Sequence, residues 1–180
     1  MTENSILTGE KVILRPITKE DTPLIVKWRN TPAVRENFIF REPFTEEMHN
    51  HWLNTKVASG EVIQYIIVDK SENLPVGSVY FRDMDRKNRT AEYGVFIGEE
   101  EARNKGLGSE TAKLFTDFGF DTLKLHRISL RLLSGNVAAE KSYKKAGFKR
   151  EGIFRDMVFL DGKYRDVVFM AMISGREENE

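Results

Sequence analysis

The chain contains 180 residues, of which 40% are hydrophobic, and its 28 basic residues balance its 28 acidic residues. This length and apolar content predict one folded domain, and a net charge of zero argues against general electrostatic binding to nucleic acid. The sequence has no cysteine, which excludes disulfides, thiol nucleophiles and cysteine-based zinc sites. With only three histidines, a histidine-based metal site is not expected either.

The ends of the chain and its apolar runs indicate where the protein resides. The first ten residues lack a basic region followed by an apolar stretch, so no secretory signal is expected. The longest apolar run, 167–173, is far shorter than the ~18–20 residues of a membrane span. We therefore expect a cytoplasmic protein with a single domain over 1–173 and a disordered, charged tail over 174–180.

The first third of the chain predicts one strand and two helices. A short strand spans 11–15, and Thr18 begins a helix with a single apolar stripe that ends before Pro32. Thr45 begins a second helix, because it precedes two glutamates that favour a helix N-terminus, and this helix runs to about residue 60.

The middle of the chain is rich in β-branched and aromatic residues. Strands are predicted over 61–69, 76–81 and 91–97, and the polar stretch 82–90 is predicted to be a loop. Strands joined by such short connections pair antiparallel.

The last third alternates helices and strands. The predicted elements are a helix over 106–121, a strand over 127–133, a helix over 136–146 capped by Gly147, and strands over 149–160 and 163–173 joined by Asp161-Gly162. The whole order predicts an α/β (α+β) fold, with a mixed, mostly antiparallel sheet of seven strands and helices on both faces.

A segment rich in glycine and basic residues, Arg103-Asn104-Lys105-Gly106-Leu107-Gly108, lies between a predicted strand and a predicted helix. Glycines let successive backbone N–H groups turn toward one point, and the helix start adds the positive end of its dipole. The segment therefore predicts a phosphate-binding loop, with a flexible surface turn as the alternative. Its spacing excludes a P-loop, and Thr111 stands where a dinucleotide fingerprint needs glycine or alanine.

Two further patterns place polar side chains for chemistry. Asn136 and Tyr143 are two helical turns apart and share one face with Glu140, so they are candidate ligand-binding groups. The alternatives are an N-cap for Asn136, which is compatible with binding, and a half-buried packing residue for Tyr143. Glu92 shares a strand face with Gly94, where the backbone can be approached closely, and is a candidate general base. A solvent-facing glutamate is the alternative.

The order of elements and these motifs resemble the GNAT superfamily of acetyl-CoA-dependent N-acetyltransferases. The pattern Arg103-x-x-Gly106-x-Gly108 is similar to its [QR]-x-x-G-x-[GA] pyrophosphate loop, and Asn136 and Tyr143 are similar to the Asn and Tyr of its next helix. The segments 7–16, 28–30 and 151–166 are similar to the ribosomal-protein N-acetyltransferase-like branch. Bacterial members that acetylate polyamines and amino sugars look much the same.

The resemblance implies acetyl-CoA as co-substrate and no metal. It places the cofactor on Val95, Phe96, Ile97, Arg103, Asn104, Lys105, Gly106, Leu107, Gly108, Ser109 and Asn136. The Tyr143 hydroxyl would protonate the leaving thiolate, and N–H groups near Val95 and Phe96 would stabilise the oxyanion. Some members carry a glutamate five residues before the asparagine, but this chain has Arg131 there. Glu92, acting through a water, is therefore the candidate base.

The acceptor implied by the resemblance is a primary amine: a polyamine, an amino sugar or a protein N-terminus. Four acids near the predicted second helix, Glu36, Glu42, Glu46 and Glu47, favour a cationic acceptor, and a solvated helix face is the alternative. A module that binds acetyl-CoA without catalysis is the alternative function. No nucleic-acid or membrane partner is expected, and a homodimer is a reasonable expectation for a soluble chain of this size.

Overall fold

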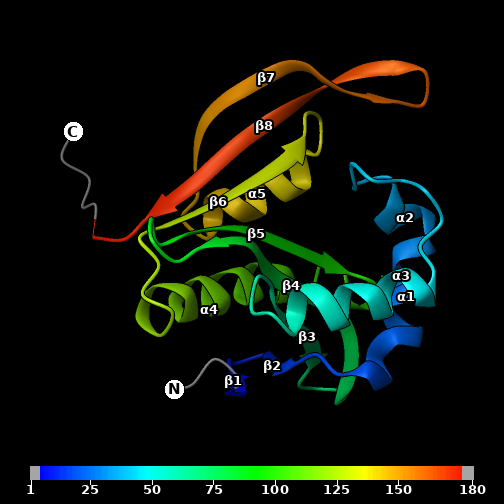
Figure 1. Cartoon of the computed structure of the whole chain (residues 1–180), viewed down its shortest axis with the longest axis vertical. Helices are drawn as coiled ribbons and strands as arrows, with labels where there is room; N and C mark the ends of the chain where they lie inside the picture. Colours follow the sequence, from blue (N-terminus) through cyan, green and yellow to red (C-terminus); the bar gives the residue numbers. More distant parts are fainter. Residues whose placement is uncertain (1–4, 176–180) are drawn as a thin grey trace.

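One sheet organises the computed structural model, which describes residues 5–175 (Figure 1). Its eight strands are β1 (Leu7–Thr8), β2 (Val12–Pro16), β3 (Ile63–Asp69), β4 (Leu74–Asp85), β5 (Thr90–Ile97), β6 (Arg127–Leu133), β7 (Lys149–Leu160) and β8 (Lys163–Ile173). The α-helices are α1 (Thr22–Asn30), α2 (Pro32–Arg35), α3 (Glu46–Trp52), α4 (Leu107–Asp121) and α5 (Val137–Lys145).

The strand order across the sheet is β1-β2-β3-β4-β5-β6-β8-β7. The β5–β6 pair is parallel, and the other neighbouring pairs are antiparallel. The predicted mixed, mostly antiparallel fold is therefore confirmed.

Helices cover both faces of the sheet, because strand side chains alternate between two apolar clusters. Ile67 of β3 packs in the cluster that contains Phe115 of α4, and its neighbour Ile66 packs in the cluster that contains Trp28 of α1. All four side chains are fully buried. The prediction of helices on both faces is thus confirmed, and the buried sheet forms a rigid support between them.

The element boundaries differ from the prediction in several places. The two-residue strand β1 adds an eighth strand at the sheet edge, where it is too short to give a periodic signal. Strand β3 begins at Ile63 instead of residue 61. The predicted loop over 82–90 is wrong in its first half, because β4 continues to Asp85. Arg82 of β4 pairs with Glu92 of β5, and after a bulge Asp85 pairs with Thr90.

The first helical region is also more divided than expected. Pro32 does not merely end a helix but begins the short helix α2. Proline suits the first position of a helix, because a backbone N–H there would have no hydrogen-bond partner within the helix. Helix α3 ends at Trp52, and the predicted remainder continues as a π-helical turn over Leu53–Val57. Of the predicted tail over 174–180, two residues form a turn after β8, and 176–180 lie outside the described residues. Within 5–175, none of the helices has the length and apolar character that crossing a membrane requires.

Strands β5 and β6 stay together for only a short distance. Their parallel register covers Thr90 with Arg127, Ala91 with Ile128 and Glu92 with Ser129. Beyond Glu92, β5 remains paired with β4 as far as Ile97, while β6 diverges from it and stays paired with β8, its partner along its whole length (Figure 1). The second half of β5 therefore has a backbone edge without a neighbouring strand.

Candidate active site

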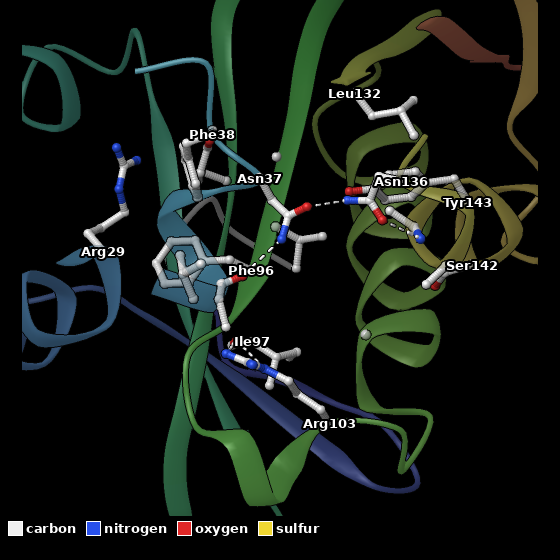
Figure 2. Close-up of a pocket in the computed structure, with 18 of the residues that line it drawn as sticks. Arg29, Asn37, Phe38, Phe96, Ile97, Arg103, Leu132, Asn136, Ser142 and Tyr143 are labelled. Atoms are coloured by element: carbon white, nitrogen blue, oxygen red, sulfur yellow. Dashed lines mark hydrogen bonds between the residues drawn. The ribbon is translucent and has the colours of Figure 1, made fainter. Parts of the chain in front are cut away.

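A cavity of about 1150 Å³ opens where β5 and β6 separate. Residues of α1, α2 and α3 form one side, which we term the α1–α3 wall, and residues of α4 and α5 form the other, the α4–α5 wall. Strands β4, β5 and β6 supply the floor. Figure 2 shows Arg29 and Phe38 on the first wall, facing Asn136 and Tyr143 on the second. This volume is slightly larger than the roughly 300–1,000 Å³ of ordinary ligand pockets.

The glycine-rich segment forms a left-handed turn into α4. Asn104 and Gly106 have φ angles of +60° and +85°, and Gly106 is the N-cap. The first bond within the helix runs from the Glu110 N–H to the Gly106 carbonyl at 3.1 Å, so the N–H groups of residues 107–109 have no partner in the preceding turn. A Cβ added at Gly108 would meet only Ile97, at 4.0 Å, so the space above this glycine is open. This geometry suits a phosphate group.

The two basic residues of the loop are placed differently. Arg103 lines the cavity, and its Nη2 donates to the carbonyl oxygen of Ile97 at 3.3 Å, which ties the loop to the end of β5 (Figure 2). Lys105 is exposed and lies outside the cavity lining, with its Nζ 3.9 Å from an Asp69 carboxylate oxygen. The structure therefore brings Arg103 to the cavity and leaves Lys105 beside it. The other predicted cofactor residues, Val95, Phe96, Ile97, Asn104, Gly106, Leu107, Gly108, Ser109 and Asn136, line the cavity.

Asn136 caps α5, as one interpretation of the sequence predicted. Its Oδ1 accepts from the Ala139 N–H at 3.1 Å. Its Nδ2 donates to Oδ1 of Asn37 at 2.7 Å, so the two asparagines join the walls across the cavity (Figure 2). The capping bond fixes the side chain, and the second bond shows that its amide is accessible from the opposite wall.

Tyr143 lines the cavity and is held by packing. Its ring meets Tyr93 edge-on at 6.1 Å between centroids and Phe148 at 5.9 Å. Burial raises the pKa of its hydroxyl, so the hydroxyl is in its neutral, protonated form at neutral pH. Ser142 next to it shares a 2.9 Å hydrogen bond with Ser109, which joins α5 to α4.

Glu92 of β5 lies in the cavity floor, between the side chains of two arginines. Arg82 contacts Oε1 with Nε at 3.1 Å and also with Nη2, and Arg131 Nη2 lies 2.8 Å from Oε2. Only 17% of the glutamate side chain is exposed, so the interpretation of Glu92 as solvent-facing is wrong. A carboxylate oxygen can accept two hydrogen bonds, so Oε2 has room for a water besides Arg131.

The four acids that suggested a cationic acceptor, Glu36, Glu42, Glu46 and Glu47, are all exposed, and none lines this cavity. Their exposure agrees with a solvated face. Glu36 also lines a second, smaller hollow that shares Asn37 and Asn136 with the cavity. Residues that the sequence analysis did not select, Arg29, His49, Tyr80 and Arg82, line the cavity instead. Alternation along β4 could have identified Tyr80 and Arg82, because they share a face with Glu92 in the antiparallel register.

His49 is the one histidine of α3 that reaches the cavity. Its side chain is buried, and Nδ1 lies 2.9 Å from the hydroxyl of Thr22, while Nε2 has no hydrogen-bond partner. Burial lowers its pKa to about 4, so the imidazole is neutral at pH 7. A neutral ring here adds no positive charge to the site.

Comparison with known proteins agrees with this geometry. Residues 11–149 match the family model described as an acetyltransferase (GNAT) domain. The chain is 28% identical to spermidine N(1)-acetyltransferase of Escherichia coli K12, over 92% of this chain and 87% of the relative. The putative ribosomal N-acetyltransferase YdaF of Bacillus subtilis is 27% identical over 58% of this chain and 56% of its own length.

Solved structures give the same fold. Spermidine N-acetyltransferase from Vibrio cholerae, solved in complex with CoA and spermine, matches with a TM-score of 0.84 at 23% identity, over 92% of this chain and 96% of that chain. At this identity the likeness concerns the fold, whereas the family match spans most of the sequence. The chain therefore belongs to the GNAT family of acetyltransferases, as its glycine-rich loop and the Asn136–Tyr143 pair indicated.

Proposed function

We propose that this protein transfers the acetyl group of acetyl-CoA to the nitrogen of a small primary amine bound beside the α1–α3 wall. One observation carries the proposal: β5 leaves β6 after Glu92, and the cavity so opened joins the start of α4 to the α1–α3 wall. A thioester and an amine held in one such cavity gain a large effective concentration.

Acetyl-CoA fits the groups on the α4–α5 wall. The N–H groups of residues 107–109 would bind its pyrophosphate, and the open space over Gly108 leaves room for it. The unpaired edge of β5 over 95–97 offers backbone groups to the amide-containing arm of the cofactor. Asn136 and Arg103 line the same part of the cavity and would also contact the cofactor.

In the proposed reaction, the neutral amine attacks the thioester carbonyl carbon. The new C–N bond forms, the C–S bond breaks with its electron pair on sulfur, the amine loses one proton, and the thiolate gains one. A backbone N–H group on the free edge of β5, at Val95 or Phe96, would stabilise the oxyanion. Tyr143 would donate the proton to sulfur, since its hydroxyl stays protonated at neutral pH.

Glu92 is the proposed base. It would take the amine proton through a water on Oε2, the oxygen that contacts a single arginine nitrogen. The spermidine acetyltransferases among the relatives support a polyamine as one acceptor to test. A single domain over 1–173, a cytoplasmic location and a homodimeric state are part of the proposal as well.

Steady-state turnover tests this function. The protein is incubated with acetyl-CoA and a panel of primary amines, free thiol is followed over time, and the acetylated amine is measured by mass spectrometry. We expect equimolar thiol and N-acetyl product. Thiol release that is no faster with the protein and any amine than in buffer alone would instead support the non-catalytic acetyl-CoA-binding module.

Cofactor choice is tested by thermal unfolding. At about 100 times its dissociation constant, a ligand that binds only the folded protein adds about 2.7 kcal/mol of stability. Acetyl-CoA is expected to raise the melting temperature accordingly, and NAD and ATP are expected to leave it unchanged. Equal stabilisation by ATP and acetyl-CoA would remove the basis for assigning the glycine-rich loop to CoA.

A further inference from the structure

The side of the cavity that would hold the acceptor is positively charged. Three arginines, Arg29, Arg82 and Arg131, line it, and among the described residues Glu92 is the one acidic residue in the lining. Arg82 has a second acidic neighbour, Asp83, at 3.7 Å, but that side chain is 74% exposed and screened by solvent. The three arginines are therefore only partly neutralised.

Of the three arginines, Arg29 has the positive charge that is least neutralised by acidic neighbours. Its guanidinium carbon lies 3.6 Å from the ring centroid of Phe38 and 4.9 Å from that of Phe44, so the group is held between two aromatic faces. Its Nε is buried without a hydrogen-bond partner, and no acidic residue within 5–175 pairs with it. Burial, and then the charge of Arg82, lower the pKa of Arg29. Arg29 as a whole is half-buried, and a partly desolvated cation without a counterion gains stability when a ligand supplies one.

The other two arginines share one carboxylate. Glu92 contacts Arg82 through Oε1 and Arg131 through Oε2, so one negative charge serves two cations. Arg131 keeps a buried Nε without a partner. Tyr80 lies on the same face of the sheet and lines the cavity together with all four groups. Burial raises the pKa of its hydroxyl, and the charges of Arg82, Arg29, Glu92 and Arg131 act on it as well.

We propose that the acceptor amine also carries an anionic oxyacid group, a carboxylate or a phosphate, and that Arg29 binds this group. This inference rests on the acetyl transfer proposed above. When a guanidinium stacks on an aromatic ring, its N–H groups still point outward in the plane of the group. Two of these N–H groups can donate parallel hydrogen bonds to two oxygens of a carboxylate or phosphate. The uncompensated positive charge would repel a polycation, and it would favour the neutral form of the amine that attacks the thioester.

Matched amines test the inference directly. Turnover of 4-aminobutanoate is compared with that of butylamine and 1,4-diaminobutane, and turnover of O-phosphoethanolamine with that of ethanolamine. The anionic member of at least one set is expected to have a kcat/KM on the order of 10-fold higher or more, and the two sets separate carboxylate from phosphate. Higher kcat/KM for 1,4-diaminobutane or spermidine than for every anionic amine overturns the proposal.

Substitution of Arg29 assigns the effect to one residue. In Arg29→Gln, KM for the preferred anionic amine is expected to rise on the order of 10–100-fold, while KM for the uncharged partner stays constant. Arg29→Lys keeps the charge without the fork and is expected to be intermediate. Arg35→Gln removes the same charge from an exposed position outside the cavity and is the matched control. An equal rise in KM for charged and uncharged amines in Arg29→Gln contradicts the role of this residue.

Direct binding separates this inference from the proposed reaction. If no amine is turned over, acetyl transfer fails, but calorimetric titration of the CoA-loaded protein with 4-aminobutanoate, O-phosphoethanolamine and 1,4-diaminobutane still tests the charge preference. Binding of an anionic amine that is lost in Arg29→Gln and kept in Arg35→Gln supports it. Failure of both anionic amines to bind, or tighter binding of the diamine, overturns it.

Discussion

On the α4–α5 wall the lining near the start of α4 consists mainly of small residues such as Gly106, Gly108 and Ser109, and its charged residues Arg103, Lys141 and Lys145 flank them. The opposite side presents a cluster of arginine and aromatic side chains around Arg29. The first arrangement comes from a short stretch of sequence, because the left-handed turn at Gly106 and the start of α4 adjoin each other. The second comes from residues on α1, β4 and β6 that are far apart in sequence. The proposed pyrophosphate site is thus a local property of the chain, and the proposed acceptor site is a property of the assembled sheet.

The largest effect is expected where the two sides meet, at Tyr143. Tyr143→Phe keeps the ring contacts with Tyr93 and Phe148 but removes the proton donor, so kcat should fall on the order of 10²–10⁴-fold with little change in CoA affinity. Tyr93→Phe is the matched control, since its buried hydroxyl has no partner and does not line the cavity. Similar kcat values for wild type and Tyr143→Phe would assign Tyr143 to packing alone.

A smaller and pH-dependent effect is expected at Glu92. Glu92→Gln removes the proposed base, so kcat/KM should fall about 10²-fold near neutral pH and recover as the pH approaches the pKa of the free amine, where solvent supplies the neutral form. The measurement is kcat/KM as a function of pH for the wild type and for Glu92→Gln. A defect of constant size across that range would mean that Glu92 only positions Arg82 and Arg131.

In the glycine-rich loop, substitution of Gly108 should change CoA binding and not folding, whereas substitution of Gly106 should change folding as well. Gly108→Val fills the open space over the helix start, so we expect the Kd for CoA to rise on the order of 10–100-fold with little loss of stability. Gly106→Ala places a side chain at a φ of +85° and should cost about 1–2 kcal/mol of stability as well. Calorimetric titration with CoA and urea unfolding measure the two effects, and unchanged CoA affinity in Gly108→Val would reduce the loop to a surface turn.

The smallest effect is expected at His49, which supports the α1–α3 wall. Its folded-state pKa of about 4 lies below the ordinary value of 6.5, so the unfolded chain binds more protons between these values and stability falls as the pH drops through this range. The loss from this group should be ~1 kcal/mol between pH 7 and pH 5.5. His49→Leu should lack this part of the pH dependence in urea unfolding, and parallel curves for the two proteins would show that His49 does not titrate in this way.

The same contrast explains how much could be predicted from the sequence. Each helix and strand near the cofactor side carries its own periodic pattern, and the glycines of the loop mark a local conformation, so these features were predictable. Arg82 and Arg131 come together only through the strand order β4-β5-β6, and Arg29 joins them only because α1 packs beside this part of the sheet. Sequence spacing contains neither fact. The positions of the acids near α2 and α3 could not be predicted for the same reason, because composition does not tell exposed positions from cavity-lining ones.

The independence of the two sides can be measured in one experiment. The Kd for CoA and the KM for the preferred acceptor are determined for wild type, Gly108→Val and Arg29→Gln under identical conditions. We predict that Gly108→Val raises the Kd for CoA at least about 10-fold and leaves the KM for the amine unchanged, and that Arg29→Gln does the reverse. Equal changes in both constants for either variant would contradict a cavity with separate cofactor and acceptor sides.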